Sequence, residues 1–427
     1  MKKILSIILA LLVLAGAAIA EDSVISGNIS SGGIAAMDGE GSLWFGMENR
    51  LIRMKSDGSM EEFAGGDARY IQAAEDGVYY VLRTADPDAG EYDDAYIDSL
   101  WHVGEDGVPV QIGPSLPVRW LEEYDPEMGC VKSSTYYLGY TDMTVYGDYI
   151  YYIGTDDVPG SYVTNATMWI EGEEGMVKAT YDGSAAVYRM KKDGSGLKKL
   201  ISGLGNSIAH MAIANDRIAV ASRYRNAVYA YDFTNFMLYS LNGKHIKTFK
   251  NNSPSRHAGL YKEEEEFTVI VQGIQTDGEK IYASLADSEG DFASSRLVDV
   301  ENVDETIVIE AHYVPAIVAP DGLYYVTADV EDTFWEEGMD DTTALYHRAA
   351  DGSVTLLAYL PRKYINFQMQ MVLLGDTIYL RSQNLYGAED KNSHLLRVRT
   401  KDRTVDELTE IGFAVCPPCD PAFAALE

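Results

Sequence analysis

The stretch Val187-Tyr-Arg-Met-Lys-Lys-Asp-Gly-Ser-Gly-Leu-Lys-Lys-Leu200 predicts the fold. Its residues alternate before Asp193-Gly194 and a second β-prone run follows, which is typical of two strands joined by a tight turn. Six related hairpins occur elsewhere, at 51–63, 100–112, 237–249, 296–309, 345–358 and 395–408. The chain is therefore expected to repeat one structural unit seven times.

A second hairpin completes each unit. Its apolar, often tyrosine-rich strand follows turn residues and another short apolar strand, and it occurs as Leu43-Trp44-Phe45, Val78-Tyr79-Tyr80, Ile150-Tyr151-Tyr152, Ile218-Ala219-Val220, Ile281-Tyr282-Ala283, Leu323-Tyr324-Tyr325 and Ile378-Tyr379-Leu380. A four-stranded sheet cannot bury both faces alone, so the copies must stack. Radial stacking predicts an all-β protein, a β-propeller of seven four-stranded blades whose first and last copies close the ring. Six or eight blades would follow if a weak copy is miscounted, and two separate β-sandwiches are the alternative architecture.

Three stretches of the repeat carry a resemblance to a known family. Val187–Leu200, preceded by Gly147-Asp-Tyr-Ile-Tyr-Tyr-Ile153, resembles one blade of a secreted bacterial propeller family of undefined function. That family is similar to the YWTD propellers of low-density-lipoprotein receptors, and Leu323-Tyr-Tyr-Val-Thr-Ala-Asp329 comes nearest to a YWTD strand. The resemblance implies a binding or scaffolding propeller and supplies no catalytic residues.

The first twenty residues predict export. Lys2 and Lys3 precede an apolar run, and Ala18-Ile19-Ala20 forms a small-residue cleavage site, as in secretory signal peptides. We expect a signal peptide over 1–20, a propeller over 21–410 and a C-terminal tail with Cys-Pro-Pro-Cys over 411–427. The protein is expected to be secreted or extracytoplasmic. It should have no membrane span after signal cleavage, because no later stretch approaches the roughly 20 apolar residues of a membrane helix.

Charge and loop length narrow the class of partner. The chain has 66 acidic and 34 basic residues and a net charge of −32, which excludes a nucleic-acid partner because phosphate binding needs a basic stripe. The long segments between blade strands fall on one predicted face: 84–98, 113–141, 154–186, 221–236, 250–267, 284–295, 327–343 and 381–394. Insertions gathered on one face of a repeat protein indicate a binding face, although they also serve to cover a rim.

The residues of these loops suggest ligand chemistry. Aromatic rings and one arginine are candidate ligand-binding residues: Tyr92, Tyr96, Tyr162, Trp169, Arg223, Phe334 and Trp335. Carboxylates are candidate calcium ligands, because Ca²⁺ takes six to eight oxygens: Asp86, Asp88, Asp93, Asp94, Asp340 and Asp341. No run has the ordered spacing of an EF-hand loop, so no cofactor is expected and calcium stays an alternative.

The sequence contains no recognisable catalytic motif. G-x-S-x-G and H-E-x-x-H are absent, and His102 and His347 occupy equivalent hairpin positions, which favours sheet packing over metal ligation. Cys130, Cys416 and Cys419 are candidates for one disulfide whose pairing is open. We therefore expect a non-catalytic recognition or scaffold propeller that binds a protein, peptide or glycan through its acidic and aromatic loop face, and we lean against an enzyme. A carbohydrate-active enzyme on a propeller scaffold and a calcium-stabilised structural surface protein are the alternatives.

Overall fold

The structure is a computed structural model of the chain. It describes residues 25–47, 49–89, 95–125, 130–156, 162–170, 173–182, 184–205, 209–226, 231–249, 269–287, 295–309, 316–328, 343–360, 369–383 and 393–411. Among these residues, no helix is long and apolar enough to cross a membrane.

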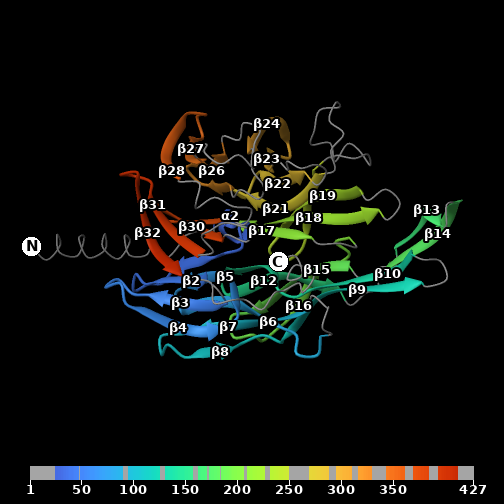
Figure 1. The fold of residues 1–427 in the computed structure, drawn as a ribbon, viewed down its shortest axis with the longest axis horizontal. Helices are drawn as coiled ribbons and strands as arrows, with labels where there is room; N and C mark the ends of the chain where they lie inside the picture. Colours follow the sequence, from blue (N-terminus) through green and yellow to red (C-terminus); the bar gives the residue numbers. More distant parts are fainter. Residues whose placement is uncertain are drawn as a thin grey trace, which may run out of the picture.

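Seven antiparallel sheets stand in a ring, which confirms the predicted seven-bladed β-propeller (Figure 1). Each blade adds its strands from the axis outward. Blade 1 comprises β1 (Ala35–Met37), β2 (Leu43–Met47), β3 (Arg50–Met54) and β4 (Met60–Gly65); blade 2 comprises β5 (Asp67–Ala74), β6 (Gly77–Ala85), β7 (Tyr96–Val103) and β8 (Pro109–Gln111); blade 3 comprises β11 (Thr141–Tyr146), β12 (Tyr149–Asp156), β15 (Ser184–Lys191) and β16 (Lys198–Ile201).

The remaining blades follow in chain order. Blade 4 comprises β17 (His210–Ala214), β18 (Arg217–Asn226), β19 (Tyr231–Ser240) and β20 (His245–Thr248); blade 5 comprises β21 (Val269–Thr276), β22 (Ile281–Asp287), β23 (Ser295–Asp299) and β24 (Asn302–Ile309); blade 6 comprises β25 (Ala316–Ala319), β26 (Gly322–Ala328), β27 (Thr343–Ala349) and β28 (Val354–Leu360); blade 7 comprises β29 (Gln370–Leu374), β30 (Thr377–Gln383), β31 (Ser393–Arg399) and β32 (Thr404–Ile411). All fourteen hairpins expected from the sequence are present.

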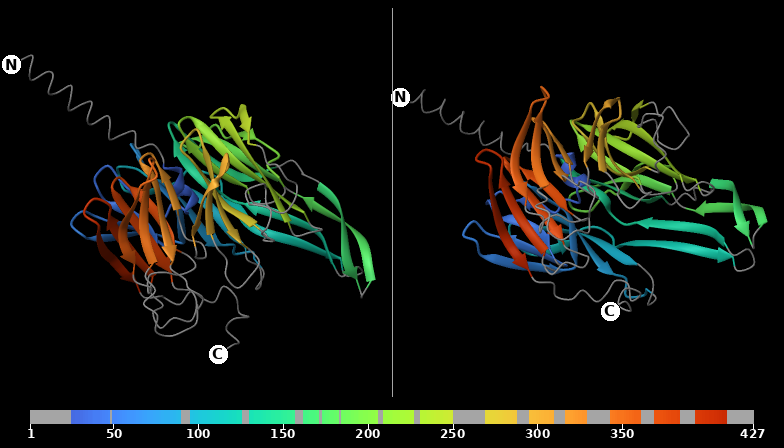
Figure 2. Two further views of the ribbon diagram at one scale, coloured as in Figure 1. Left: turned by 90° about the horizontal axis from the view of Figure 1, so that it is seen from above. Right: turned by 45° about the horizontal axis from the view of Figure 1, so that its top comes forward.

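Two of the predicted long loops contain hairpins of their own. The crossover after blade 2 forms β9 (Leu116–Asp125) and β10 (Cys130–Leu138), and the insertion inside blade 3 forms β13 (Tyr162–Ile170) and β14 (Glu173–Asp182). Strand β14 pairs in parallel with β10, so the two hairpins join into one sheet continuous with blade 2. In Figures 1 and 2 this sheet projects from one side of the ring. A third predicted loop, 221–236, is largely an extension of β18 and β19.

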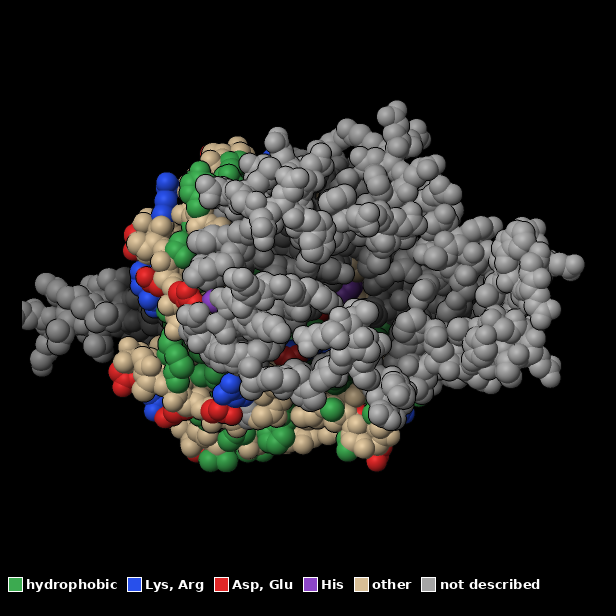
Figure 3. Space-filling view, viewed as in Figure 1, with side chains coloured by type: hydrophobic (Ala, Val, Ile, Leu, Met, Phe, Trp, Pro, Cys, Tyr) green, Lys and Arg blue, Asp and Glu red, His purple; other side chains and the backbone are tan. Residues whose placement is uncertain are grey.

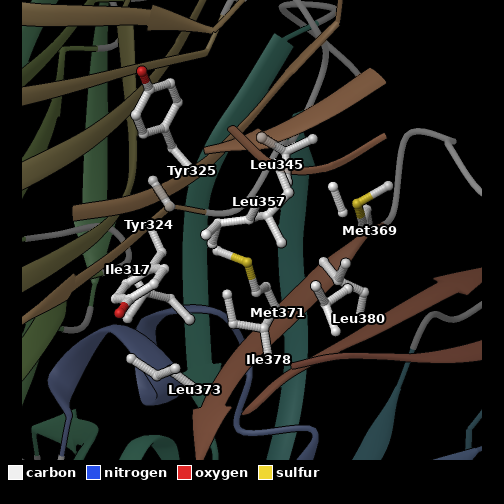
Figure 4. Close-up of a cluster of buried hydrophobic side chains, with 14 of the residues drawn as sticks. Ile317, Tyr324, Tyr325, Leu345, Leu357, Met369, Met371, Leu373, Ile378 and Leu380 are labelled. Carbon is white, nitrogen blue, oxygen red and sulfur yellow. The ribbon is translucent and has the colours of Figure 1, made fainter. Parts of the chain in front are cut away.

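The core lies between the blades, because each sheet presents an apolar face to each neighbour. Blades 6 and 7 enclose one cluster in which Ile317 and Leu345 face Met371, Ile378 and Leu380 (Figure 4). Similar clusters fill the other blade junctions. One of them packs Phe45 of blade 1 against residues of blade 7 and so confirms that the first and last copies close the ring.

Polar side chains link the innermost strands around the axis. Gln72 of β5 donates from its side-chain amide to the Met143 carbonyl at 2.8 Å, and its carbonyl accepts from the Val145 amide at 2.9 Å. Gln275 of β21 accepts from the Val318 amide at 2.7 Å and donates to the Ala316 carbonyl. Neighbouring inner strands are splayed apart, and these side chains satisfy backbone groups that no sheet partner reaches.

Blades 1 and 7 share no strand, and the segment before β1 strengthens their closure. The short helix α2 (Ser26–Ser30) lies at the axis and contacts inner strands of five blades. The Asn28 side-chain amide donates to the Leu373 carbonyl, and its carbonyl accepts from the Leu373 amide, both at 2.8 Å. The Ser31 hydroxyl accepts from the Met371 amide at 3.1 Å, and the Ser26 hydroxyl exchanges two hydrogen bonds with the Thr276 backbone. The N-terminal segment therefore fastens the ring from inside.

Candidate functional site

Charged side chains gather at the end of the axis where the long loops leave the blades. Inner strands begin at this end, and the second strand of each blade ends there. The pairing register of blade 2 sets Asp67, Arg83 and Asp98 side by side on three adjacent strands. Arg83 donates from Nε and Nη2 to the two oxygens of Asp98 at 2.7 and 3.0 Å. Asp98 is completely buried and also accepts from the Tyr140 amide at 3.2 Å, so this ion pair anchors the wall of the site.

Asp67 lies next to this pair and stays accessible to solvent. The Nε of Arg69 donates to the Asp67 carboxylate, and their side chains are 39% and 28% exposed, respectively. Burial acts to raise the pKa of Asp67, but Arg69, Arg381 and Arg83 outweigh it and hold the pKa below the ordinary value of 3.8. The Asp67 carboxylate is therefore ionised at neutral pH.

Blade 7 contributes the third guanidinium. Arg381 lies on β30 and donates from Nε to the Gln370 side-chain carbonyl at 3.0 Å, and from Nη1 to the Gly46 backbone carbonyl of blade 1. Burial lowers the pKa of Arg381, while the negative charge of Asp67 opposes that shift. Residues more than 300 positions apart in the chain thus meet at one point because the ring closes between blades 7 and 1.

A β-bulge interrupts strand β5 within the cluster. The register of β5 against β6 shifts between Arg69 and Gln72, and Tyr70 adopts a left-handed backbone with φ of 51°. The Tyr70 amide donates to the Gly32 carbonyl at 2.9 Å, so the segment after α2 holds the bulge. Non-glycine residues in this conformation cost about 1–3 kcal/mol and cluster at functional sites, where bulges redirect side chains. The bulge turns Tyr70 toward blade 3.

The surroundings of Tyr70 raise its pKa, whereas those of Asp67 lower the pKa of the carboxyl group. Burial, followed by the negative charge of Asp142, raises the pKa of Tyr70 to about 12, against smaller opposing contributions that include Arg69. Asp142 also has a positive φ, of 50°, and its carboxylate accepts from the Met211 amide at 2.8 Å and lies 3.3 Å from Nδ1 of His210. The neighbouring blades 3 and 4 therefore extend the group of ionisable residues.

These residues form what we call the axial charged cluster. It comprises Asp67, Arg69, Tyr70, Arg83, Asp98, Asp142, His210 and Arg381. Figure 3 views this end of the ring, and acidic, basic and histidine side chains are visible near its middle. The cluster combines an ionised carboxylate, a protonated tyrosine and guanidinium groups, which are the components of acid–base chemistry on an anionic or polar substrate.

The structure tests few of the site residues expected from the sequence. Tyr96 begins β7 at the cluster, and the Arg83 guanidinium lies 5.9 Å from its ring centroid. Asp86 and Asp88 lie in the turn after β6, where the Asp86 carboxylate accepts from the Asp88 amide at 3.0 Å. Among the described residues no group of three or more His, Cys, Asp or Glu could hold a metal ion.

The other expected residues fall in two groups. Tyr162 and Trp169 lie on β13, Cys130 on β10 and Arg223 on β18, so Arg223 belongs to a strand rather than a loop; only their backbone is described. Tyr92, Asp93, Asp94, Phe334, Trp335, Asp340, Asp341, Cys416 and Cys419 lie outside the described residues. The proposed calcium and disulfide sites stay predictions.

His102 and His347 pack as the sequence suggested. Each ring stacks on a tyrosine of the neighbouring strand, His102 on Tyr79 and His347 on Tyr324, with centroids 4.4 Å apart in both pairs. Each tyrosine hydroxyl donates to the aspartate of its own turn, for example Tyr79 to Asp76 at 2.8 Å. The two pairs are equivalent structural devices at the turn end of blades 2 and 6.

The arginines of the cluster were missed by sequence reasoning. Arg69, Arg83 and Arg381 stand at strand ends in three separate segments, whereas the sequence directs attention to the long loops. The repeat pattern gives no shared signal either, because Arg83 lies three residues after Tyr80 whereas Arg381 directly follows the equivalent Leu380. The tertiary structure is what brings these arginines together around Asp67.

Solved structures resemble this chain only at low sequence identity. No protein-family model matches the chain, and no curated protein matches it. Among solved structures, a puromycin hydrolase S511A mutant complexed with PGG matches at 9% identity and a TM-score of 0.48, over 93% of this chain and 57% of that one. A Porphyromonas gingivalis dipeptidyl peptidase 4 matches at 12% identity and a TM-score of 0.40, over 92% and 62%. An oligogalacturonate lyase in complex with manganese matches at 10% identity and a TM-score of 0.41, over 84% of both chains.

These matches correct two expectations. This chain spans under two thirds of the length of the first two of these proteins, and all three are named as enzymes. The interpretation as a non-catalytic recognition or scaffold protein, and the leaning against an enzyme, are therefore wrong. The physical reason is that a propeller needs no linear catalytic motif, because side chains from different blades converge on its axis; the absence of such motifs from the sequence does not argue against an enzyme.

Proposed function

We propose that the protein is a carbohydrate-active enzyme that hydrolyses glycosidic bonds at the axial charged cluster. One observation carries the proposal: Asp67 is an accessible carboxylate whose pKa is held low by guanidinium groups, while the pKa of Tyr70, on the same strand of the cluster, is raised to about 12. Two titratable groups whose environments push their pKa values apart mark a base and an acid.

The roles of the two groups follow from their charge at neutral pH. Asp67 is ionised and accepts a proton from the attacking water, while Tyr70 is protonated and donates its proton to the glycosidic oxygen that leaves. The bond from the sugar carbon to that oxygen breaks as the bond to the water oxygen forms. Exchange of protons with solvent then returns Asp67 to the carboxylate and Tyr70 to the phenol.

Release of reducing ends from a panel of acidic and neutral polysaccharides tests the proposal. The chain 21–427 should cleave at least one of them, and Asp67→Asn should lower kcat by about 10²–10⁴-fold, the contribution of a positioned acid or base. Asp76→Asn is the matched control, because Asp76 also has a lowered pKa but lies at the opposite end of blade 2, bound by Tyr79 and Lys192. Failure of the parent protein to cleave any polysaccharide, or full activity of Asp67→Asn, would overturn the proposal.

Export and family membership are proposals as well. The basic start, apolar run and Ala18-Ile19-Ala20 site support cleavage after Ala20 and an extracytoplasmic location. The seven-bladed ring is consistent with the resemblance of Val187–Leu200 to the secreted YWTD-like family. N-terminal sequencing of protein recovered from the culture medium tests both export and the cleavage position; a chain retained in the cytoplasm with Met1 intact would refute them.

A further inference from the structure

The three arginines of the cluster differ in how many of their guanidinium nitrogens donate hydrogen bonds to the protein. Arg83 gives two nitrogens to Asp98, and Arg381 gives all three of its nitrogens to Gln370 and Gly46. Arg69 gives only Nε, to Asp67. Within the described part of the chain, both terminal nitrogens of Arg69 lack a protein partner, and the side chain is 39% exposed. Arg69 is therefore the guanidinium of the axial charged cluster that a ligand from solvent can reach.

The charge around Asp67 differs from that of the whole protein. Among the described residues beside Asp67, Arg69, Arg83 and Arg381 carry three positive charges, while Asp67 and Asp98 carry two negative ones. Asp142, the other carboxylate of the cluster, accepts from the Met211 amide and lies beside His210 of blade 4. The described side chains around Asp67 are thus net positive, in a chain whose net charge is −32. A net positive group of side chains in an acidic protein favours an anionic group at that place.

We propose that Arg69 binds a carboxylate carried by the sugar, and that the substrate is an acidic, uronate-containing glycan. The inference rests on the proposed function and names its substrate class. The two terminal nitrogens of a guanidinium form a planar fork that matches the two oxygens of a carboxylate. A neutral sugar would leave those donors without an equivalent partner. Arg83, held rigid by Asp98 and close to the ring of Tyr96, adds a second positive charge to the same wall.

Binding of chemically matched ligands tests the inference without relying on turnover. Hexasaccharides of galacturonate, mannuronate and glucuronate are each paired with their carboxyl-reduced, neutral counterparts and titrated by calorimetry. The protein is the Tyr70→Phe variant, which leaves Asp67 and Arg69 in place. At least one acidic hexasaccharide should bind tenfold or more tightly than its reduced counterpart, and this preference should weaken as salt is added.

Variants of Arg69 and of a control arginine complete the test. Arg69→Ala should abolish most of the preference for the acidic ligand, and Arg69→Lys should restore only part of it, because an ammonium lacks the planar fork. Arg189→Ala is the control, since Arg189 stacks on Tyr149, 4.2 Å from its ring centroid, on an outer strand of blade 3. Circular dichroism and thermal unfolding confirm that each variant folds.

The outcomes separate this inference from the proposed function. Equal binding of acidic and reduced ligands, or a preference unchanged by Arg69→Ala, would overturn the inference. If the parent protein cleaves only neutral polysaccharides, the enzyme stands and the substrate class is wrong. If acidic hexasaccharides bind through Arg69 and no polysaccharide is cleaved, the binding site stands and the proposed reaction fails.

Discussion

The fastening of the ring by Asn28 leads to a quantitative prediction. Asn28→Ala removes two hydrogen bonds of 2.8 Å to Leu373 and leaves both backbone groups of Leu373, whose side chain is 3% exposed, without their partner. A neutral hydrogen bond contributes about 1 kcal/mol net, and an unsatisfied buried group costs about 1–3 kcal/mol. Allowing for water that reaches one of the two groups, the free energy of unfolding should fall by about 2–4 kcal/mol.

Differential scanning calorimetry measures this loss. Unfolding entropy is about 2.1 cal/mol/K per residue, so a ring of about 390 residues loses about 1.2 °C of Tm per kcal/mol, and Asn28→Ala should lower Tm by about 2–5 °C. The control is Gln111→Ala, which removes an exposed amide that bonds Gly113 and Ser115 and should change Tm by less than about 1 °C. Equal shifts in the two variants would refute the reasoning that α2 closes the ring, because side-chain packing between blades 1 and 7 would then suffice.

Three further predictions follow from the charges and the tyrosines. Asp98→Ala leaves the Arg83 guanidinium without its partner and should lower the free energy of unfolding in urea by about 3–5 kcal/mol. The double replacement Arg83→Met with Asp98→Leu should lower it by less, because no unpaired charge is left. A larger loss for the double replacement would refute the structural role of the ion pair. Burial is the main cause that raises the pKa of Tyr70 to about 12 and the only cause that raises the pKa of Tyr80 to about 12. Both hydroxyls should therefore stay protonated at pH 11 in a titration followed by absorbance at 295 nm. Their contribution to stability is complete below pH 10 and is lost as pH rises toward 12. Hydrogen bonds from the Ser195 hydroxyl, and then from the Ser195 amide, lower the pKa of Asp193. The contribution of Asp193 to stability is therefore present above pH 4 and is lost as pH falls through the folded pKa. Carboxyl NMR of Ser195→Ala should show that the pKa of Asp193 rises, and an unchanged pKa would contradict this cause.

The fold was predictable because its signals are local. A hairpin is specified by alternation over a few residues and by a turn such as Asp193-Gly194, where Gly194 has φ of 80°. Seven weak copies of one pattern reinforce each other, so the blade count was correct even where single copies were poor. The predicted loops were less accurate. Segments 113–141 and 154–186 lack the short apolar blade pattern, yet they form hairpins because each supplies the pairing edge that the other needs.

The candidate site was not predictable by the same means. Tyr96 was chosen because it is aromatic and lies in a long loop, and it does contact the cluster through Arg83. Arg69 and Arg381 gave no such signal, since an arginine at a strand end is ordinary in any sheet. The surroundings of Arg69 and Arg381 depend on which side chains lie close to them in space. That depends on how the strands of different blades are placed around the axis.

The sequence alone therefore determined the repeat, the four-stranded unit, the turns and the acidic character, because each depends on neighbours within about a dozen residues. The tertiary structure decided the rest. Closing the ring brings Arg381 of blade 7 to Asp67 of blade 2, pins Leu373 to Asn28 across 345 positions, and places Tyr70 of the blade 2 bulge near Asp142 of blade 3. A group of three arginines around Asp67 in a protein of net charge −32 exists only through these long-range contacts, since electrostatic interactions follow distance in space and not separation along the chain.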